Sequence, residues 1–251
     1  MNMDRLSASV EDACLNAWPA LKEIFYDGWL IRLSEGHTRR TNSVNVIGEG
    51  GYALDDKIAY CRAIYSAHGL PTHFRLRSND HSGLDATLAA HGFRAEDVTR
   101  TLYMDFATAP PQSQRVPEVE VMLGQPTHEW LAAHQHFSGQ PYAPNNIRKR
   151  LLDLVALPTA FACMRKDGEI ASVAYGAVHD RLVSLQWVAT NPKLRRKGLS
   201  RATVLSLLCW ARDQGAQGAC LQVVADNLPA VRLYEAMGFD RELYRYHYRV
   251  L

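Results

Sequence analysis

The stretch "NPKLRRKGLSRA" at residues 191–202 decides how the chain is interpreted. Two arginines and a lysine stand directly before Gly198, at a corner where a predicted strand gives way to a predicted helix. The first N–H groups of a helix have no partner within it, and the helix dipole adds positive charge there. A glycine at such a corner lets the backbone approach an anion closely. The alternative is a solvated basic turn in which Gly198 only relieves strain, and this stretch alone does not separate the two.

A second motif lies downstream, "NLPAVRLYEAMGF" at residues 227–239. Residues 195–200 resemble the Q/R-x-x-G-x-G/A signature of the GNAT family of acyl-CoA-dependent N-acyltransferases, with Ser200 at the last small position. Residues 227–239 are similar to that family's N-x-x-A-x-x-L-Y-E-x-x-G-F element. The resemblance covers about residues 117–251. Neither a P-loop G-x-x-x-x-G-K-[ST] nor a Rossmann G-x-G-x-x-G after a strand is present, which disfavours the nucleotide-binding alternatives.

The predicted secondary structure of the second half follows the element order of that family. Hydrophobic periodicity and turn residues predict one strand, two helices, three strands, a helix, a strand, a helix and a final hairpin. In chain order these lie at 118–123, 127–137, 145–156, 159–166, 169–179, 181–190, 199–214, 219–225, 229–238 and 240–251. The fold class expected is α/β, with a twisted, mixed but mostly antiparallel sheet flanked by helices.

The chain also repeats itself weakly. Residues 74–93 align without gaps on residues 220–239, and both segments end in Gly-Phe and continue into an aromatic-rich strand. A segment containing three prolines, 106–121, separates the two halves. We interpret the chain as two tandem GNAT folds, with a degenerate copy at 1–108, a linker at 109–117 and a catalytic copy at 118–251. The corner counterpart in the first copy, residues 48–60, is acidic and suits a pyrophosphate poorly.

The resemblance implies acetyl-CoA as the acyl donor and assigns contacts to it. Backbone amides at the corner would bind the pyrophosphate, and the end of the preceding strand would hydrogen-bond the pantetheine arm. The implied cofactor-binding residues are Val188, Ala189, Thr190, Arg195, Arg196, Lys197, Gly198, Leu199, Ser200, Asn227 and Tyr234. Tyr234 is also the implied catalytic residue, as the general acid that protonates the departing thiolate. A packed tyrosine on an amphipathic helix is the alternative for Tyr234, and helix capping is the alternative for Asn227.

The sequence names no general base. The predicted strand at 181–190 has Gln186 and Trp187 in its middle and no carboxylate inside. Alternatives outside the strand middle are His179, Asp180, His134 and His136. Deprotonating a lysine-like amine of pKa ~10.4 at neutral pH costs ~4–5 kcal/mol, whereas an α-amine near ~8 costs only ~1 kcal/mol. The pattern therefore fits an acceptor amine of low pKa or a base supplied by the other domain.

Acceptor-binding candidates come from two places. "GHTRRTNSVN" at residues 36–45 resembles an N-terminal element of some two-domain bacterial GNAT proteins, and a strand, a turn and a second strand are predicted around it. Two arginines there could clamp a carboxylate of the acceptor, or the hairpin could simply be packed. The segment 138–146 lies where the family shapes its acceptor pocket. The substrate-contact candidates are Trp29, Arg39, Arg40, Tyr142 and Gln186.

Composition restricts the partners. The chain of 251 residues has 28 Lys+Arg against 26 Asp+Glu, a net charge of +2, which disfavours nucleic acid and membrane surfaces as partners. Five scattered cysteines without C-x-x-C spacing indicate neither disulfides nor a metal site, and buried packing is expected for most of them. The N-terminal residues do not resemble a signal peptide, so a cytoplasmic location is expected, and a homodimer is compatible with the sequence.

The function predicted is N-acetyl transfer, directly from acetyl-CoA to a primary amine of a small molecule, amino acid or peptide within a ternary complex. The alternative is a non-catalytic acyl-CoA sensor or interaction module that keeps the fold. It is favoured by the missing carboxylate and opposed by Tyr234. A third idea, an interaction domain that uses residues 148–150 with 195–197, is disfavoured by the balanced charge.

Overall fold

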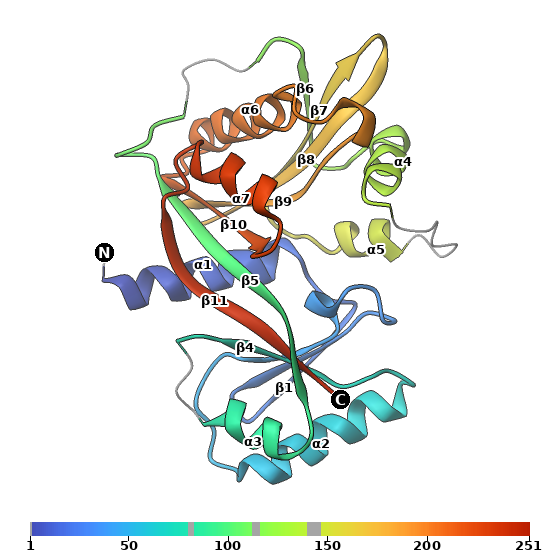
Figure 1. Cartoon of the computed structure of the whole chain (residues 1–251), viewed down its shortest axis with the longest axis vertical. Coiled ribbons are helices and arrows are strands. Elements are labelled where there is room, and N and C mark those ends of the chain that lie inside the picture. Colours follow the sequence, from blue (N-terminus) through green and yellow to red (C-terminus); the bar gives the residue numbers. More distant parts are fainter. Residues whose placement is uncertain (1, 80–82, 112–115, 140–146) are drawn as a thin grey trace. The chain divides into compact units, whose positions relative to one another are not determined.

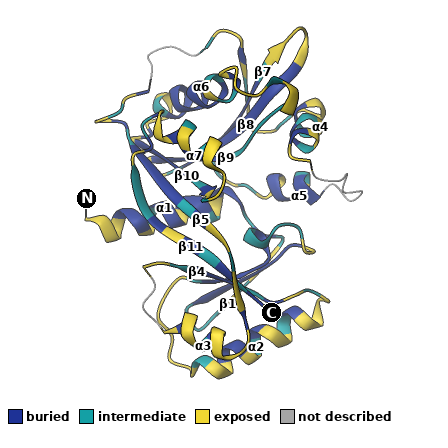
Figure 2. Ribbon diagram, in the orientation of Figure 1, coloured by how far each residue is buried: buried dark blue, intermediate teal, exposed yellow. Residues whose placement is uncertain are grey.

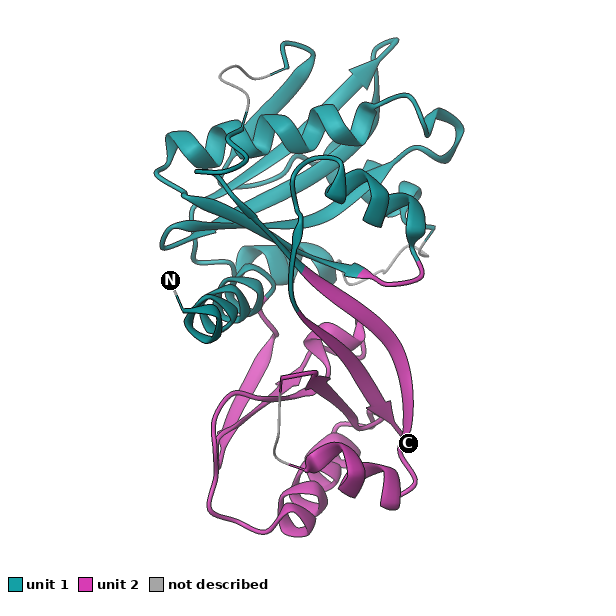
Figure 3. Ribbon diagram, turned by 60° about the vertical axis from the view of Figure 1, so that its left-hand side comes forward, with its two compact units in different colours: residues 1–18, 102–223, 227–243 teal, residues 19–101, 224–226, 244–251 magenta. Residues whose placement is uncertain are grey.

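The computed structural model describes residues 2–79, 83–111, 116–139 and 147–251. The chain divides into two compact units, each assembled from separate stretches of sequence (Figure 3). Unit 1 comprises residues 1–18, 102–223 and 227–243, and unit 2 comprises residues 19–101, 224–226 and 244–251. The predicted domains at 1–108 and 118–251 follow the chain, so their boundaries do not coincide with these units.

The units differ from the predicted domains because of the positions of one helix and two strands. Helix α1 (Met3–Ala17) belongs to unit 1. Strand β5 (Arg94–Asp105) begins in unit 2 and ends in unit 1, whereas β11 (Arg241–Val250) begins in unit 1 and ends in unit 2. There, the end of β11 pairs antiparallel with β4 (His73–Arg77). The predicted final hairpin is therefore wrong, because residues 240–251 contain no Gly, Pro or Asn to reverse the chain and form one continuous strand.

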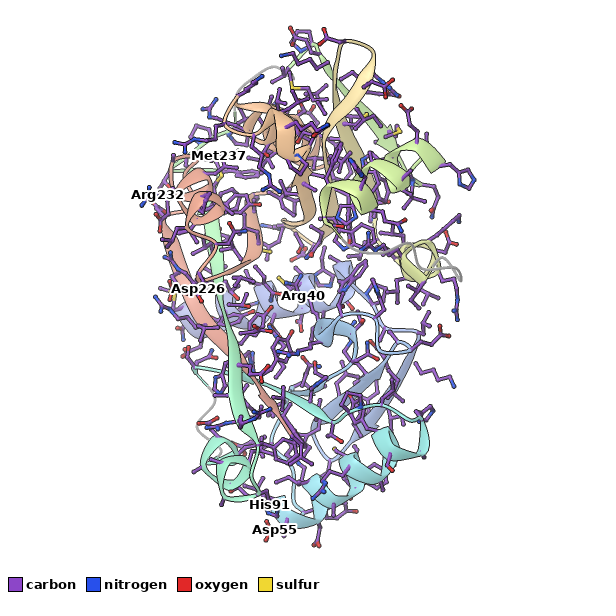
Figure 4. The ribbon with its side chains drawn as sticks, turned by 45° about the vertical axis from the view of Figure 1, so that its right-hand side comes forward. Arg40, Asp55, His91, Asp226, Arg232 and Met237 are labelled. Carbon is purple, nitrogen blue, oxygen red and sulfur yellow. The ribbon has the colours of Figure 1, made fainter. Side chains whose placement is uncertain are left out.

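Unit 2 is a sheet with two helices on one side (Figure 1). Its strand order is β1-β2-β3-β4-β11, antiparallel except for the parallel pair β3 and β4. Apolar side chains of alternate strand positions, such as Phe74 and Leu76, pack with residues of both helices. At the surface, His91 hydrogen-bonds Asp55 (2.9 Å; Figure 4). The remaining elements are β1 (Lys22–Tyr26), β2 (Trp29–Leu33), the 3-10 helix η1 (Arg39–Thr41), β3 (Val44–Val46), α2 (Leu54–Ala67) and α3 (Leu84–Ala90).

Unit 1 contains the motifs that the sequence singles out. Its strand order is β5-β10-β9-β8-β7-β6, and β9 and β10 form its parallel pair among the registers described. In chain order the elements are β6 (Val119–Leu123), α4 (His128–Phe137), α5 (Ile147–Asp153), β7 (Thr159–Lys166), β8 (Glu169–His179), β9 (Leu182–Thr190), η2 (Pro192–Leu194), α6 (Leu199–Asp213), β10 (Gly218–Val224) and α7 (Leu228–Glu235). The predicted α/β class with a mostly antiparallel sheet flanked by helices is confirmed.

The sheet of unit 1 is packed on both faces. Side chains alternate across a strand, so successive residues of β9 reach opposite faces. Val183 and Leu185 belong to the apolar core formed with α6, whereas Ser184 donates a hydrogen bond to the Cys14 sulfur of α1 (3.8 Å). Buried residues run along α6, β8 and β9 (Figure 2). Both faces of the central strands are therefore removed from water.

The cysteines confirm the packing expected of them. All five are free and buried. Burial raises the pKa of the Cys163 thiol to about 11 and that of Cys61 to about 12, which keeps both protonated at neutral pH. The sulfur atoms of Cys14 and Cys220 lie 4.0 Å apart. None of the helices in the described ranges is long and apolar enough to cross a membrane.

An acid-sensitive cluster closes the turn between β1 and β2. The Asp27 carboxylate accepts hydrogen bonds from the N–H groups of Gly51 (2.8 Å) and Tyr52 (2.9 Å), and it pairs with Lys57 (3.0 Å). These two backbone donors, followed by Lys57, lower the pKa of Asp27 to about 2. A lowered folded-state pKa stabilises the fold above the unfolded value of about 4, and that stability is lost as the pH falls toward about 2.

Replacing Asp27 by asparagine is therefore expected to flatten this part of the pH profile. The amide keeps the size of the side chain and tolerates the left-handed backbone at this position (φ 44°), but it does not titrate. The free energy of unfolding, measured in urea from pH 7 to pH 2, should differ most between wild type and Asp27→Asn at neutral pH. The difference should shrink between about pH 4 and about pH 2. Parallel profiles would show that the cluster contributes nothing to acid sensitivity.

Candidate active site

The candidate site is built around the end of β9. The parallel pairing of β9 with β10 covers residues 182–185 and 218–221, although β9 continues to Thr190 and β10 to Val224. On its other side β9 stays paired with β8 as far as Thr190. The edge of residues 186–190 that faces β10 thus lies outside the parallel register, whereas the opposite edge is paired with β8. We call the first of these the released edge of β9. A released edge of this kind can hydrogen-bond an extended ligand as though the ligand were another strand.

The corner that follows presents backbone amides. Gly198 precedes α6 with φ 78° and makes no side-chain cap, so the first N–H groups of this long helix point out of its N-terminus without intrahelical acceptors. Arg196 also has a positive φ (62°). A Cβ added to Gly198 would meet nothing within 4 Å. Glycine is therefore favoured here by the left-handed backbone and by the open space beside it, not by packing against the protein.

Ser200 fixes the corner to the strand. Its hydroxyl hydrogen-bonds that of Thr190, the last residue of β9, and Thr190 in turn donates to the Ser172 hydroxyl of β8 (3.1 Å). The Ser172 hydroxyl donates to the Ala189 carbonyl (3.2 Å). This chain of hydroxyls orients the first turn of α6 relative to the released edge of β9. The serine that departs from the family signature thus has a structural role that glycine or alanine could not supply.

Tyr234 lies on the buried side of α7. It belongs to the apolar core with Val231 and Met237, whereas Arg232 of the same helix is exposed (Figure 4). Its ring meets the edge of Phe239 at 5.9 Å, and the hydroxyl makes no hydrogen bond to any described residue. Burial raises the pKa of Tyr234 well above its ordinary value, so the phenol stays protonated at physiological pH. At the start of α7, Asn227 accepts a hydrogen bond from the Ala230 N–H (3.4 Å), which is the capping contact.

A β-bulge redirects the strand just before the released edge. The register of β8 with β9 shifts between Val173 and Tyr175, so that Trp187 and Val188 together face one residue of β8. Trp187 has φ 52°, a strained value for a bulky side chain. Such bulges re-aim side chains next to functional sites. Here the bulge sends the Trp187 indole into a group of rings: Trp18, Trp130, His134 and Tyr175, at centroid distances of 4.5, 6.3, 4.5 and 5.7 Å.

Arg148 and His134 complete this group. The Arg148 guanidinium lies 5.8 Å from the Trp187 ring centre, and its Nη1 donates to Nδ1 of His134 (3.3 Å). His134 stacks on Trp187 with only 14° between the ring planes. Since Nδ1 accepts from Arg148, the proton of a neutral His134 sits on Nε2. We define Trp18, His134, Arg148, Tyr175 and Trp187 as the bulge cluster. Trp18 directly follows α1, and the other members come from α4, α5, β8 and β9, which no sequence pattern links.

The sequence-derived substrate candidates are dispersed. Trp29 is part of the unit 2 core, packed between Phe74 and the Lys57 ammonium. Arg39 pairs with Glu96 (2.7 Å) and Asp97, while Arg40 donates to the Tyr246 hydroxyl (3.3 Å). In unit 1, the buried Gln186 amide donates to Ser184 (2.9 Å). Tyr142 lies outside the described residues.

Two of the alternatives for the base are at the wrong end of the strand. His179 and Asp180 lie at the β8–β9 turn, eight residues before Val188, which places them roughly 26 Å along the strand from it. His134 is closer, but its Nδ1 already accepts from Arg148. We therefore assign His134 a positioning role, orienting Arg148 and Trp187 within the bulge cluster, rather than the role of the base.

Residues 8–249 match the model of one protein family, described as "Probable histone acetyltransferase Rv0428c C-terminal". The chain belongs to this family. It is accordingly an acetyltransferase of the GNAT type. It is 25% identical over 247 residues to the uncharacterized N-acetyltransferase YobR of Bacillus subtilis, covering 96% of this chain and 97% of that protein. It is 29% identical over 171 residues to a mycothiol acetyltransferase of Thermomonospora curvata, covering 62% of this chain and 56% of that one.

Solved structures share the GNAT fold of this acetyltransferase. A GCN5-related N-acetyltransferase from Kribbella flavida superposes with a TM-score of 0.69 at 15% identity, covering 99% of this chain and 95% of the other. A tandem GNAT protein from the clavulanic acid biosynthesis pathway superposes with a TM-score of 0.64 at 13% identity, covering 83% and 74%. The family resemblance read from residues 195–200 and 227–239 is confirmed by these comparisons.

Proposed function

We propose that the protein transfers an acetyl group from acetyl-CoA to a primary amine of a small molecule, amino acid or peptide. The observation that carries the proposal is the joint placement of the released β9 edge and the glycine corner. Residues 188–190 offer backbone groups along the strand, and the next turn offers the amides of α6. The two lie in the order in which an extended arm and its pyrophosphate would need them.

The residues present fit CoA in size and charge. Gly198 leaves open space where any other residue would place a Cβ, and the N-terminus of α6 supplies N–H groups to a pyrophosphate. Arg195, Arg196 and Lys197 are exposed around it. Val188, Ala189 and Thr190 would hold the pantetheine arm, with Leu199 and Ser200 in the first helical turn and Asn227 at the start of α7.

The chemistry proposed is direct. Bound acetyl-CoA would supply the thioester. A backbone N–H near Val188 or Ala189 would donate to the developing oxyanion, which is the most effective place for a fixed donor. As the amine nitrogen bonds the acyl carbon and the C–S bond breaks, Tyr234 would donate its proton to the departing sulfur. The nitrogen would then release its extra proton, directly or through water, to the Tyr234 phenolate, which restores the phenol. The raised pKa of Tyr234 keeps its hydroxyl protonated at physiological pH, so a proton donor is present when the thiolate forms.

Small-molecule acceptors are favoured by the relatives. Several similar proteins are named mycothiol acetyltransferases and one is named streptothricin acetyltransferase, and the substrates in those names are small molecules. The described strand middle carries Gln186 and Trp187, and no carboxylate stands between residues 182 and 190. We therefore expect an acceptor amine that is substantially neutral at the working pH.

Titration with acetyl-CoA in a calorimeter is the first test. We expect saturable binding close to one molecule per chain, because the corresponding corner of unit 2, residues 48–60, is acidic and suits a pyrophosphate poorly. Release of thiol on addition of amines would then establish turnover. Binding without turnover for any amine would support the acyl-CoA sensor instead. Failure to bind acetyl-CoA would contradict the proposal altogether.

A further inference from the structure

We propose that Trp18, which directly follows the first helix of the chain, is a positioning residue for acetyl transfer. Trp18 holds Trp187 in the β-bulge, and the bulge aims the N–H of Val188 at the developing oxyanion. The inference rests on the proposed function, because it names the side chain outside β9 on which the oxyanion donor depends. It also gives helix α1 a part in the chemistry of unit 1.

The direction of the backbone identifies Val188 as the donor. The N–H of Asn191 donates to the Ala171 carbonyl of β8 (2.9 Å), so the backbone of residue 191 faces β8. Backbone groups of successive residues in a strand face opposite edges. Ala189 therefore also faces β8, whereas the N–H of Val188 faces the released edge of β9. That edge is where the acyl donor is proposed to lie.

The side chains show what the bulge does to Trp187. Leu185 belongs to the core formed with α6, whereas Ser184 lies on the opposite face and donates to a sulfur of α1. Strict alternation would place residue 187 on the α6 face, together with Leu185. The Trp187 ring instead meets Trp18 on the α1 face, with 4.5 Å between the ring centres. Val188 then packs against the core with α6 again. The bulge thus moves one side chain to the other face.

Trp18 is placed to keep Trp187 there. A bulky residue with a left-handed backbone (φ 52° at Trp187) persists only where its surroundings hold it. Trp18 meets the Trp187 indole edge-on, with 69° between the ring planes, so it opposes sliding of that indole along the stacked His134 ring. Trp18 is itself fixed, because the Tyr175 hydroxyl donates to the Ala17 carbonyl (2.7 Å) and ties the end of α1 to β8.

The far side of Val188 is restrained as well. The Ser172 hydroxyl donates to the Ala189 carbonyl, and the Thr190 hydroxyl donates to Ser172. The N–H of Val188 thus lies between two restrained residues, of which Trp187 has the strained backbone. Relaxation of Trp187 to an ordinary extended conformation would turn the next peptide plane and its N–H. A donor stabilises the oxyanion only while it is aimed at it, so losing Trp18 should slow the acyl transfer.

The Val188 amide can be observed by itself. Tryptophan is followed by valine only at residues 187–188 of the sequence. Protein labelled at the carbonyl carbon of tryptophan and at the amide nitrogen of valine therefore gives one correlated NMR signal, that of Val188. In the free protein, Trp18→Leu should move this signal, because the bulge relaxes. Acetyl-CoA should shift the amide proton downfield in wild type, and much less in Trp18→Leu.

Kinetics give the second measurement. Trp18→Leu should lower kcat by about 100-fold and change the dissociation constant of acetyl-CoA by less than about threefold. The split is expected because the corner and the end of β9 still hold the donor. Trp18→Phe keeps an aromatic edge against Trp187 and should restore most of the rate. Trp18→Met, which fills more of the space, takes the place of Trp18→Leu if that variant does not fold.

Trp210→Leu is the matched control. Trp210 is 2% exposed, as Trp18 is, but it belongs to the core formed with α6 on the opposite face of the sheet. The same substitution should lower the midpoint of thermal unfolding to a similar extent, because a buried indole is lost in each case. It should leave the Val188 signal and kcat near their wild-type values. Equal effects of the two substitutions on Val188 and kcat would show general loosening of unit 1 and overturn the inference.

The remaining outcomes separate this inference from the proposed function. Wild type that binds acetyl-CoA without a shift of the Val188 amide would overturn the inference and leave the acetyltransferase proposal standing. An unchanged Val188 signal and kcat in Trp18→Leu would do the same. Failure of wild type to bind acetyl-CoA would contradict the proposed function and remove the inference with it.

Discussion

Gly198→Val is expected to weaken CoA binding by at least about 100-fold, which corresponds to about 2.7 kcal/mol. Two effects act together. The valine side chain occupies the open space beside the corner, where an added Cβ now meets nothing within 4 Å. A β-branched residue also resists φ 78°, so the amides that follow turn away from their present direction. Loss of one or two charge-assisted contacts to a pyrophosphate accounts for the magnitude.

The same helix provides the control at its other end. Gly215 follows the C-terminus of α6 with φ 89°, and a Cβ added there also meets nothing within 4 Å. Gly215→Val should therefore cost a similar free energy of unfolding, about 1–2 kcal/mol, through backbone strain alone. Calorimetry of both variants with CoA should show weak binding only for Gly198→Val. Equal affinities in the two variants would mean that the corner does not hold the cofactor.

Tyr234→Phe is expected to lower kcat by about 100-fold while changing the dissociation constant of acetyl-CoA less than about threefold. The hydroxyl has no hydrogen bond to a described residue, so its removal leaves no partner unsatisfied, and the free energy of unfolding should hardly change. The ring remains in the core against Phe239. The variant therefore separates the proposed proton donation from core packing, which is the alternative role for Tyr234.

Tyr65→Phe is the matched control for this experiment. The Tyr65 hydroxyl is buried in unit 2 and donates to the Arg32 carbonyl (2.8 Å). Its removal should cost about 1 kcal/mol of stability and leave kcat unchanged. A wild-type rate in Tyr234→Phe would return that residue to core packing, and the leaving sulfur would then need another donor. Transient and steady-state release of CoA thiol, measured under saturating donor, distinguishes the two results.

The sequence anticipates those parts of the site that lie in one continuous segment. The corner at 195–200 and the helix at 227–239 are local: a glycine before an amphipathic helix and an asparagine cap before another are visible in the residues themselves. Turn chemistry and hydrophobic spacing likewise predict the strands and helices of the second half, because each depends on neighbours in the chain.

The bulge cluster could not be anticipated in the same way. Trp18 is more than 100 residues from every other member, and its helix α1 packs on β8 and β9 of unit 1 although it opens the first predicted copy. The positive φ of Trp187 has no signature in a tryptophan-containing strand. A mid-helix histidine and an arginine in a basic run, "RKR", are typical of solvated surfaces. Only the fold brings His134 and Arg148 against the same indole.

Strands β5 and β11 each span both units, and this has a consequence for folding during translation and for evolution. Residues 19–101 are made early, yet the sheet that they form is completed by residues 244–251. Unit 2 therefore cannot acquire all of its strands on the ribosome until residues 244–251 have been translated. Cutting the gene at the linker would likewise leave two products that each lack a strand. A chain whose two units exchange strands in this way is difficult for evolution to divide into two independent proteins.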